Sequence, residues 1–195
     1  NIEQNKIESV KNQLVGNNSE LLQALSNEVP AGNYIFRDYG ICPFAASRCE
    51  DGGDLIKTSS FSTPTPQGYL GIQNCIRCRH FITGPAFIGG LLAITNEILL
   101  QSNDQSEICS KLQLKINEIN QNIDNIEKEE YIANLKQQRF EGASKRSNFE
   151  TELRNFESEY ETAAKKLDML LCDIQAAYGH ITRCHKIINS SALLE

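Results

Sequence analysis

Residues 149–188 read FETELRNFESEYETAAKKLDMLLCDIQAAYGHITRCHKII. Apolar side chains recur along this stretch at alternating spacings of four and three residues, the heptad pattern of a helix that packs along one seam. Glu, Lys, Asn and Gln fill the other faces. The stretch therefore predicts one long amphipathic helix. Its seam positions are Phe149, Leu153, Phe156, Tyr160, Ala163, Leu167, Leu170, Ile174, Ala177, Ile181, Cys184 and Ile188.

A shorter seam precedes it. The pair Gly84-Pro85 predicts the start of this earlier helix, because proline is favoured at the first helical position. Residues 101–105 are polar, and Asp104 with Glu107 has capping-box spacing, so we expect the helix to restart there. The seam positions after this interruption are Leu112, Ile116, Ile119, Ile123 and Ile126.

Residues 140–144 read as a turn between the two seams. Gly142 suits the end of the first helix, and Ser147 with Glu150 suits the start of the second. Two seams joined by a short turn favour an antiparallel two-helix hairpin, or coiled coil, with its turn near 141–146. The alternative is that the second helix pairs with a partner chain, and its longer apolar stripe leaves surface for a dimer.

Four of the seven cysteines lie in one segment that lacks helical periodicity. Cys42 and Cys49 form one pair, and Cys75 and Cys78 form a C-x-x-C knuckle. Four thiolates in two pairs are typical of a closed, structural Zn²⁺ site, which has no open position for catalysis. A small irregular segment of this kind also needs a staple to fold.

Two alternatives to a four-thiolate site remain open. His80 is a candidate to replace one of the cysteines as a zinc ligand. The second alternative is that the cysteines bind no metal and are redox-active or unrelated thiols. A thioredoxin-like C-x-x-C, however, needs a βαβ context that the sequence does not show.

Three regions follow from these patterns in a mainly α chain of 195 residues. Residues 1–29 are expected to form a helical lead-in from a preceding domain, residues 30–84 a small irregular zinc-binding module, and residues 85–195 the hairpin. The chain begins with Asn1, so we expect it to be a piece of a longer protein. It has no signal-peptide pattern and no run of about 18 apolar residues, which predicts a cytoplasmic protein without a membrane segment.

The formal net charge of −6 argues against a broad surface for phosphate binding. Any contact with DNA would need a local patch, and Arg77, Arg79 and His80 are the candidates. The alternative is that these three are ordinary solvated side chains.

No catalytic set emerges from the sequence. His180-x-x-Arg183 matches one box of a tyrosine recombinase site, but the other parts of such a site are missing, and we expect a helical surface cluster instead. Cys184 and His185 are neighbours on a helix and point about 100° apart, which disfavours a nucleophile–base pair.

The run of residues 40–43, the segment 49–53 and the run CIRCRHFITGPAF at residues 75–87 resemble the C-terminal part of the gamma-mobile-trio integrases. These are tyrosine-recombinase-like proteins of bacterial mobile elements. The resemblance is densest over residues 40–100 and carries over no catalytic residue. It implies that the catalytic domain lies upstream and that this region serves DNA docking or subunit assembly.

The sequence thus predicts a non-catalytic accessory region of a mobile-element integrase, with structural zinc as its cofactor. The hairpin is expected to bind protein, either a second copy or other integrase subunits, and DNA is a candidate partner of the knuckle face. The rival hypothesis is a stand-alone zinc-stabilised adaptor unrelated to recombination.

Overall fold

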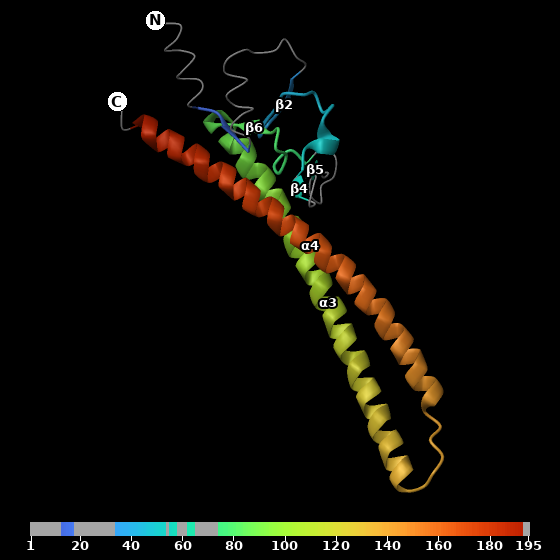
Figure 1. Ribbon diagram of the computed structural model, residues 1–195. Coiled ribbons are helices and arrows are strands. Elements are labelled where there is room, and N and C mark those ends of the chain that lie inside the picture. The colour runs from blue at the N-terminus through green and yellow to red at the C-terminus, as the bar shows by residue number, and fades with distance from the viewer. Residues whose placement is uncertain (1–12, 18–33, 54, 58–61, 65–73, 193–195) are drawn as a thin grey trace, which may run out of the picture. The chain divides into compact units, whose positions relative to one another are not determined.

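The computed structural model describes residues 13–17, 34–53, 55–57, 62–64 and 74–192. Two long helices dominate these residues, together with two small antiparallel sheets (Figure 1). The predicted mainly α class is confirmed. Nearly all of the expected lead-in at 1–29 lies outside the described residues. Within the described part of the chain, no helix combines the length and apolar character needed to cross a membrane.

The chain divides into two compact units. The first, which we call the sheet unit, takes in the chain up to residue 101 and residues 169–195. The second, the hairpin unit, consists of residues 102–168. Both long helices run from one unit into the other, and each unit is described by itself.

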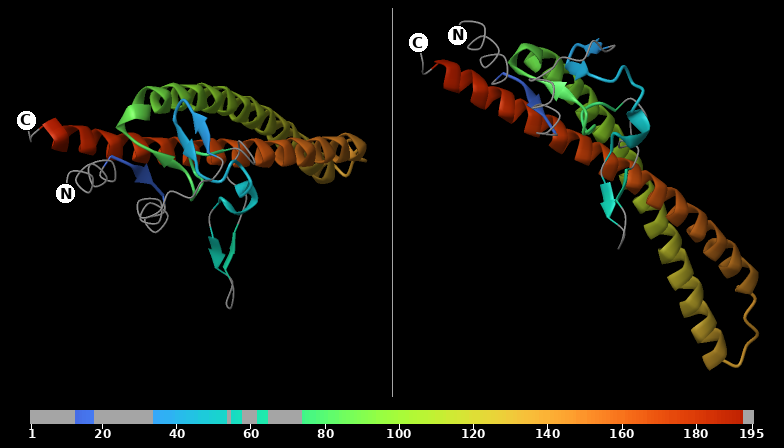
Figure 2. Two further views of the ribbon diagram at one scale, coloured as in Figure 1. Left: turned by 90° about the horizontal axis from the view of Figure 1, so that it is seen from above. Right: turned by 45° about the horizontal axis from the view of Figure 1, so that its top comes forward.

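The larger sheet lies in the sheet unit and has four strands in the order β1-β6-β3-β2. Their bounds are Val15–Gly16, Ile82–Thr83, Gly40–Cys42 and Ile35–Arg37. Both views in Figure 2 place these strands beside the first turns of α3. A second sheet pairs β4 (Leu55–Lys57) with β5 (Ser62–Pro64).

The segment expected to be irregular therefore contains strands, and this part of the prediction was wrong. Each strand has only two or three residues, which is too short to show the alternation by which strands are recognised. Val15 and Gly16, which belong to the expected helical lead-in, pair with Thr83 and Ile82 instead.

The first long helix begins close to the predicted place. Pro85–Phe87 form a 3₁₀ turn, η3, and α3 then runs over Ile88–Leu135. A side chain at Gly90 would overlap the backbone of Asp38, whereas one at Gly89 would meet nothing within 4 Å. Gly90 thus allows α3 to approach the turn between β2 and β3 closely.

The predicted restart of this helix at residues 101–105 was wrong, because α3 is continuous there. Ser102 and Gln105 are buried. The Gln105 side-chain amide donates a hydrogen bond of 3.2 Å to the carbonyl oxygen of Ala163. The polar residues therefore serve a contact between the two helices of the hairpin unit.

The connection between the helices lies slightly earlier than expected. α3 ends at Leu135, and α4 runs over Ala143–Ala192. Gln137 has a left-handed backbone (φ 56°), and the amide of Gln138 donates to the Ala133 carbonyl at 2.9 Å. This is a Schellman-type helix end. Gly142, expected at that end, precedes α4 instead, and its carbonyl accepts from the Arg146 amide.

The predicted seams form the inner faces of both helices. In the sheet unit, Ile98, Leu170 and Ala177 pack with Ile76. In the hairpin unit, Ile116, Ile119, Ile126 and Ala163 are buried. Ile188 is an exception at 39% exposure. The contacts of Gln105 with Ala163 and of Glu130 with Arg146 show that the helices are antiparallel within the hairpin unit.

Candidate metal centre

The fold brings the two cysteine pairs to one end of the larger sheet. Cys42 ends β3, and Cys49 begins the 3₁₀ turn η1 (Cys49–Asp51). Cys75 and Cys78 lie in the loop before β6, and the pairing of Ile41 with Ile82 sets β6 against β3. Residues far apart in sequence thus become neighbours because short strands pair.

Backbone amides point at two of the sulfur atoms. The Ala46 amide lies 3.5 Å from Sγ of Cys42, and the His80 amide lies 3.4 Å from Sγ of Cys78. Tight turns shape the knuckle, since the Cys78 amide donates to the Cys75 carbonyl at 3.0 Å. Amide donors of this kind stabilise a thiolate and are expected in a metal knuckle.

The thiols lie close enough to affect one another's protonation. Burial raises the pKa of Cys49, and the neighbouring Cys42 and Cys78 raise it further. Burial also raises the pKa of Cys75, to which Cys42 and Cys78 again contribute. Gathered thiols resist ionisation together, and a bound cation would reverse that tendency.

The donor set has the chemistry that zinc prefers, namely soft thiolates with an imidazole close by in sequence. Within the described ranges, however, no group of three or more His, Cys, Asp or Glu side chains is arranged so as to hold a metal ion. The four cysteines are free thiols. The structure therefore brings the four thiols into one region.

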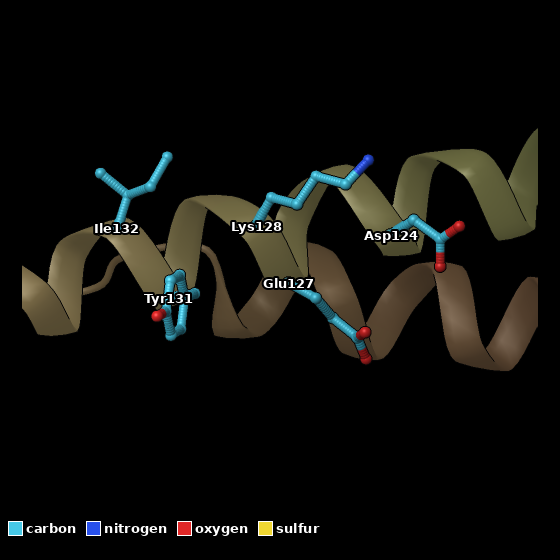
Figure 3. Close-up of a pocket in the computed structure, with 5 residues that line it drawn as sticks. All are labelled: Asp124, Glu127, Lys128, Tyr131 and Ile132. Carbon is cyan, nitrogen blue, oxygen red and sulfur yellow. The ribbon is translucent and has the colours of Figure 1, made fainter.

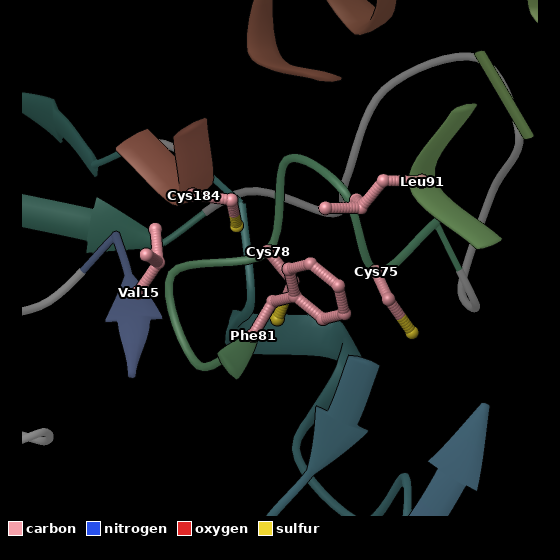
Figure 4. Close-up of a cluster of buried hydrophobic side chains, with 6 residues drawn as sticks. All are labelled: Val15, Cys75, Cys78, Phe81, Leu91 and Cys184. Atoms are coloured by element: carbon pink, nitrogen blue, oxygen red, sulfur yellow. The ribbon is translucent and has the colours of Figure 1, made fainter. Parts of the chain in front are cut away.

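Cys75 differs from the other three thiols in its surroundings. Tyr39 lies near its thiol, and Arg37 lowers the pKa of Cys75 against the larger effect of burial. It also belongs to a buried apolar cluster at the sheet. Figure 4 shows the members of that cluster, Val15, Cys75, Cys78, Phe81, Leu91 and Cys184.

The carboxylate of Asp51 contacts three side chains close to the cysteines. Oδ2 of Asp51 accepts from Arg48 and, at 3.0 Å, from Nη2 of Arg79. Oδ1 of Asp51 lies 3.1 Å from Nε2 of His80. The hydrogen bond from Arg48 is the main reason that the pKa of Asp51 falls to about 2, although burial opposes it. Burial is the main reason that the pKa of His80 is lowered.

The three candidate DNA contacts are all engaged within the protein. His80 is 5% exposed. Arg79 pairs with Asp51, and Nη1 of Arg77 lies 3.7 Å from Oδ1 of Asp173. No pattern in the sequence indicated these carboxylate partners, because they come from distant segments.

Sequence reasoning missed a buried polar link between the knuckle and α4. The Asn74 side-chain amide donates to Oδ1 of Asp173 at 2.9 Å, and Nε2 of His180 bonds the Ile76 carbonyl at 2.9 Å. Asp173 and His180 are fully buried, so His180 is not the surface residue we expected. Asp173 and His180 are seven residues apart, and each lies next to a seam position. This heptad spacing was the signal in the sequence that both face the helix interface.

Comparisons with protein-family models, with curated proteins and with solved structures found no match to this chain.

Proposed function

We propose that this chain is a non-catalytic accessory module, stapled by structural zinc, whose helical hairpin binds protein. Following the resemblance to gamma-mobile-trio integrases, its proposed task is the assembly of recombinase subunits. The observation that carries the proposal is a set of exposed apolar side chains on the α3 part of the hairpin unit.

The zinc part of the proposal is supported by the gathering of the thiols. Cys42, Cys49, Cys75 and Cys78 lie in one region, and amides are directed at two of the sulfurs. When bound, zinc would cross-link the loops that carry the cysteines and so stabilise their folded conformation. The pairing of β3 with β6 holds together the two loops that present the cysteine thiols.

A non-catalytic role is supported by the surroundings of Cys184 and His180. Cys184 is fully buried, and burial raises its pKa, which makes its thiol a poor nucleophile. His180 is also fully buried, and its Nε2 is bonded to the Ile76 carbonyl. These groups fit a packing role better than a chemical one.

The protein-binding part rests on apolar surface in the hairpin unit. Leu114 and Leu135 are each 67% exposed and Tyr131 is 65% exposed, with Ile108 and Ile132 also exposed. Tyr131 and Ile132 line an open groove together with Asp124, Glu127 and Lys128 (Figure 3). Large apolar side chains beside a polar rim are typical of protein interaction sites.

Leu114, Ile132 and Leu135 lie within roughly 60° of one another around the helix axis, as their spacing along an α-helix requires. A face of this kind suits another helix better than the edge of a base pair. The net charge of −6 disfavours a DNA backbone as the occupant. A second copy of the same hairpin is therefore the proposed partner.

Analytical ultracentrifugation of the zinc-loaded chain tests this proposal. We expect concentration-dependent dimerisation that is lost in a double variant carrying Ile132→Glu and Leu135→Glu, and retained in the polar control Gln113→Glu. A wild-type chain that stays monomeric at about 100 μM, a concentration at which even weak interfaces associate, would remove the support for self-assembly.

Duplex DNA at low salt separates the proposal from a DNA-docking role. A DNA-docking module should bind the duplex with an affinity that falls as salt rises, and a stand-alone adaptor should bind none. The assembly role predicts dimerisation without strong DNA binding by the chain alone.

A further inference from the structure

The proposed zinc has five candidate donors, and a structural site takes four. We propose that His80 is one of the four ligands, through Nδ1, and that Cys75 is the thiol outside the set. The ligands are then Cys42, Cys49, Cys78 and His80. This inference rests on the proposed zinc site and specifies its ligands.

The two ring nitrogens of His80 have different surroundings. Nε2 lies 3.1 Å from Oδ1 of Asp51. Nδ1 is buried and has no hydrogen-bond partner among the residues that the structure describes. A buried nitrogen without a partner is unfavourable, and a ligand at Nδ1 would satisfy it.

The carboxylate fixes the tautomer. An ionised carboxylate only accepts, so Nε2 must carry the proton that faces Asp51. Nε of Arg79 also lies 3.3 Å from this nitrogen and would donate to a bare Nε2, but the contact of Nε2 with the ionised Asp51 is shorter and is the stronger, charge-assisted one. If Nε2 carried no proton, its lone pair would face a lone pair of Oδ1 of Asp51 at 3.1 Å, which is unfavourable. Nδ1 therefore keeps its lone pair, which is the form that binds a metal.

Metal-bound histidines usually donate their distal N–H to a carboxylate, and His80 with Asp51 has this arrangement. The carboxylate is held firmly in place, because Arg48 and Arg79 both bind Asp51. The ring is thus oriented before any metal arrives.

Three segments that carry the proposed thiolate ligands also surround His80. Its backbone amide donates to Sγ of Cys78 at 3.4 Å. Its ring meets the edge of Phe44, two residues after Cys42, with centroids 4.9 Å apart. Asp51 follows Cys49 by two residues. The imidazole therefore lies where the loops of all three other ligands meet.

Cys75, unlike Cys42 and Cys49, belongs to the buried apolar cluster. Arg37 and Tyr39 lie near its thiol, as do Cys42 and Cys78. It is packed with Phe81 and Leu91 in the apolar cluster, where the sulfurs of Cys75 and Cys78 lie on either side of the Phe81 ring in the view of Figure 4.

X-ray absorption spectroscopy at the zinc edge of the full, zinc-loaded chain tests the ligand set. We expect three sulfur atoms at about 2.3 Å and one nitrogen at about 2.0–2.1 Å. Four sulfur atoms would overturn the assignment of His80 while leaving the zinc proposal intact. A chain that binds no zinc would overturn the zinc proposal itself, so the two failures are distinct.

Variants supply an independent readout through zinc affinity, measured by competition with a chelating dye. Cys75→Ser is expected to keep about one zinc per chain, like the control Cys172→Ser, whereas His80→Ala loses it. Asp51→Asn should weaken binding about 10- to 100-fold, the usual effect of removing a carboxylate that orients a metal ligand. Loss of zinc in Cys75→Ser with retention in His80→Ala would overturn the inference. Where a variant does not fold, the wild-type spectrum decides.

Discussion

Nε2 of His180 lies 2.9 Å from the carbonyl oxygen of Ile76, joining α4 to the cysteine loop across 104 residues of sequence. The other ring nitrogen lies 3.2 Å from Nη2 of Arg183. The neutral imidazole therefore donates through Nε2 and accepts through Nδ1. The ring also packs edge-on against Phe81, with centroids 5.3 Å apart.

This geometry makes the stability of the sheet unit sensitive to acid. Burial is the main cause of the lowered pKa of His180. The unfolded chain therefore binds a proton more readily than the folded chain. The contribution of His180 is fully present above its ordinary pKa of about 6.5, and is lost as the pH falls below that value.

Urea unfolding between pH 7.5 and 5 measures this contribution. The free energy of unfolding should fall with decreasing pH, with a slope from this one group of at most about 1.4 kcal/mol per pH unit. His180→Gln should show a shallower fall than the wild type, and His185→Gln, at an exposed site, should match the wild type. Equal slopes in all three proteins would contradict the assignment.

A pair of adjacent glycines tests the close approach of α3 to the sheet. Gly90→Ala would push a methyl group into the backbone of Asp38, so we expect a loss of about 1–3 kcal/mol in the free energy of unfolding. Gly89→Ala meets open space and should be neutral or stabilise by up to about 1 kcal/mol, the usual helix preference for alanine. Chemical denaturation of the two variants checks the contrast. Equal effects would show that Gly90 is not a contact point.

The end of α3 offers a stabilising substitution. Gln137 adopts a left-handed backbone, which costs a residue with a side chain about 1 kcal/mol. Gln137→Gly relieves that cost and should raise the melting temperature. Gln138→Gly is the matched control, where glycine brings only added chain entropy and should lower stability slightly. A fall in melting temperature for Gln137→Gly would contradict the described helix end.

Arg146 joins the two helices near their connection. Its three side-chain nitrogens each lie 3.0 Å from a carboxylate oxygen, on Glu127, Glu130 and Glu150. These ion pairs are exposed and are screened by salt. Arg146→Gln should therefore speed amide hydrogen exchange around the connection at low salt and have less effect at high salt. Lys145→Gln removes the same charge next door and should change exchange less.

The long seams were predictable because heptad spacing extends over many residues. A few atypical residues at single positions therefore do not hide the pattern. The seam from Phe149 to Cys184 was recognised in this way and lies on the inner face of α4. The strands had no comparable signal, because a pair such as Val15 and Gly16 is defined by its partner and not by its own pattern.

The end of α3 was harder to predict than its start. Gly142 looked like the residue that ends α3, but Gln137 takes the left-handed conformation instead. In the site, the cysteines were visible as a pattern, while Asp51 and Asp173 became partners only through folding.

Bound zinc is the feature on which the proposed module depends, and metal content by elemental analysis tests it most directly. The protein should be purified without chelator and measured beside Cys49→Ser and Cys78→Ser, which remove a thiolate from each loop. We expect about one zinc per chain in the wild type and little in either variant. A wild-type chain that folds without metal would contradict the proposal, and the loops around β3 and β6 would then be held by the sheet and the apolar cluster alone.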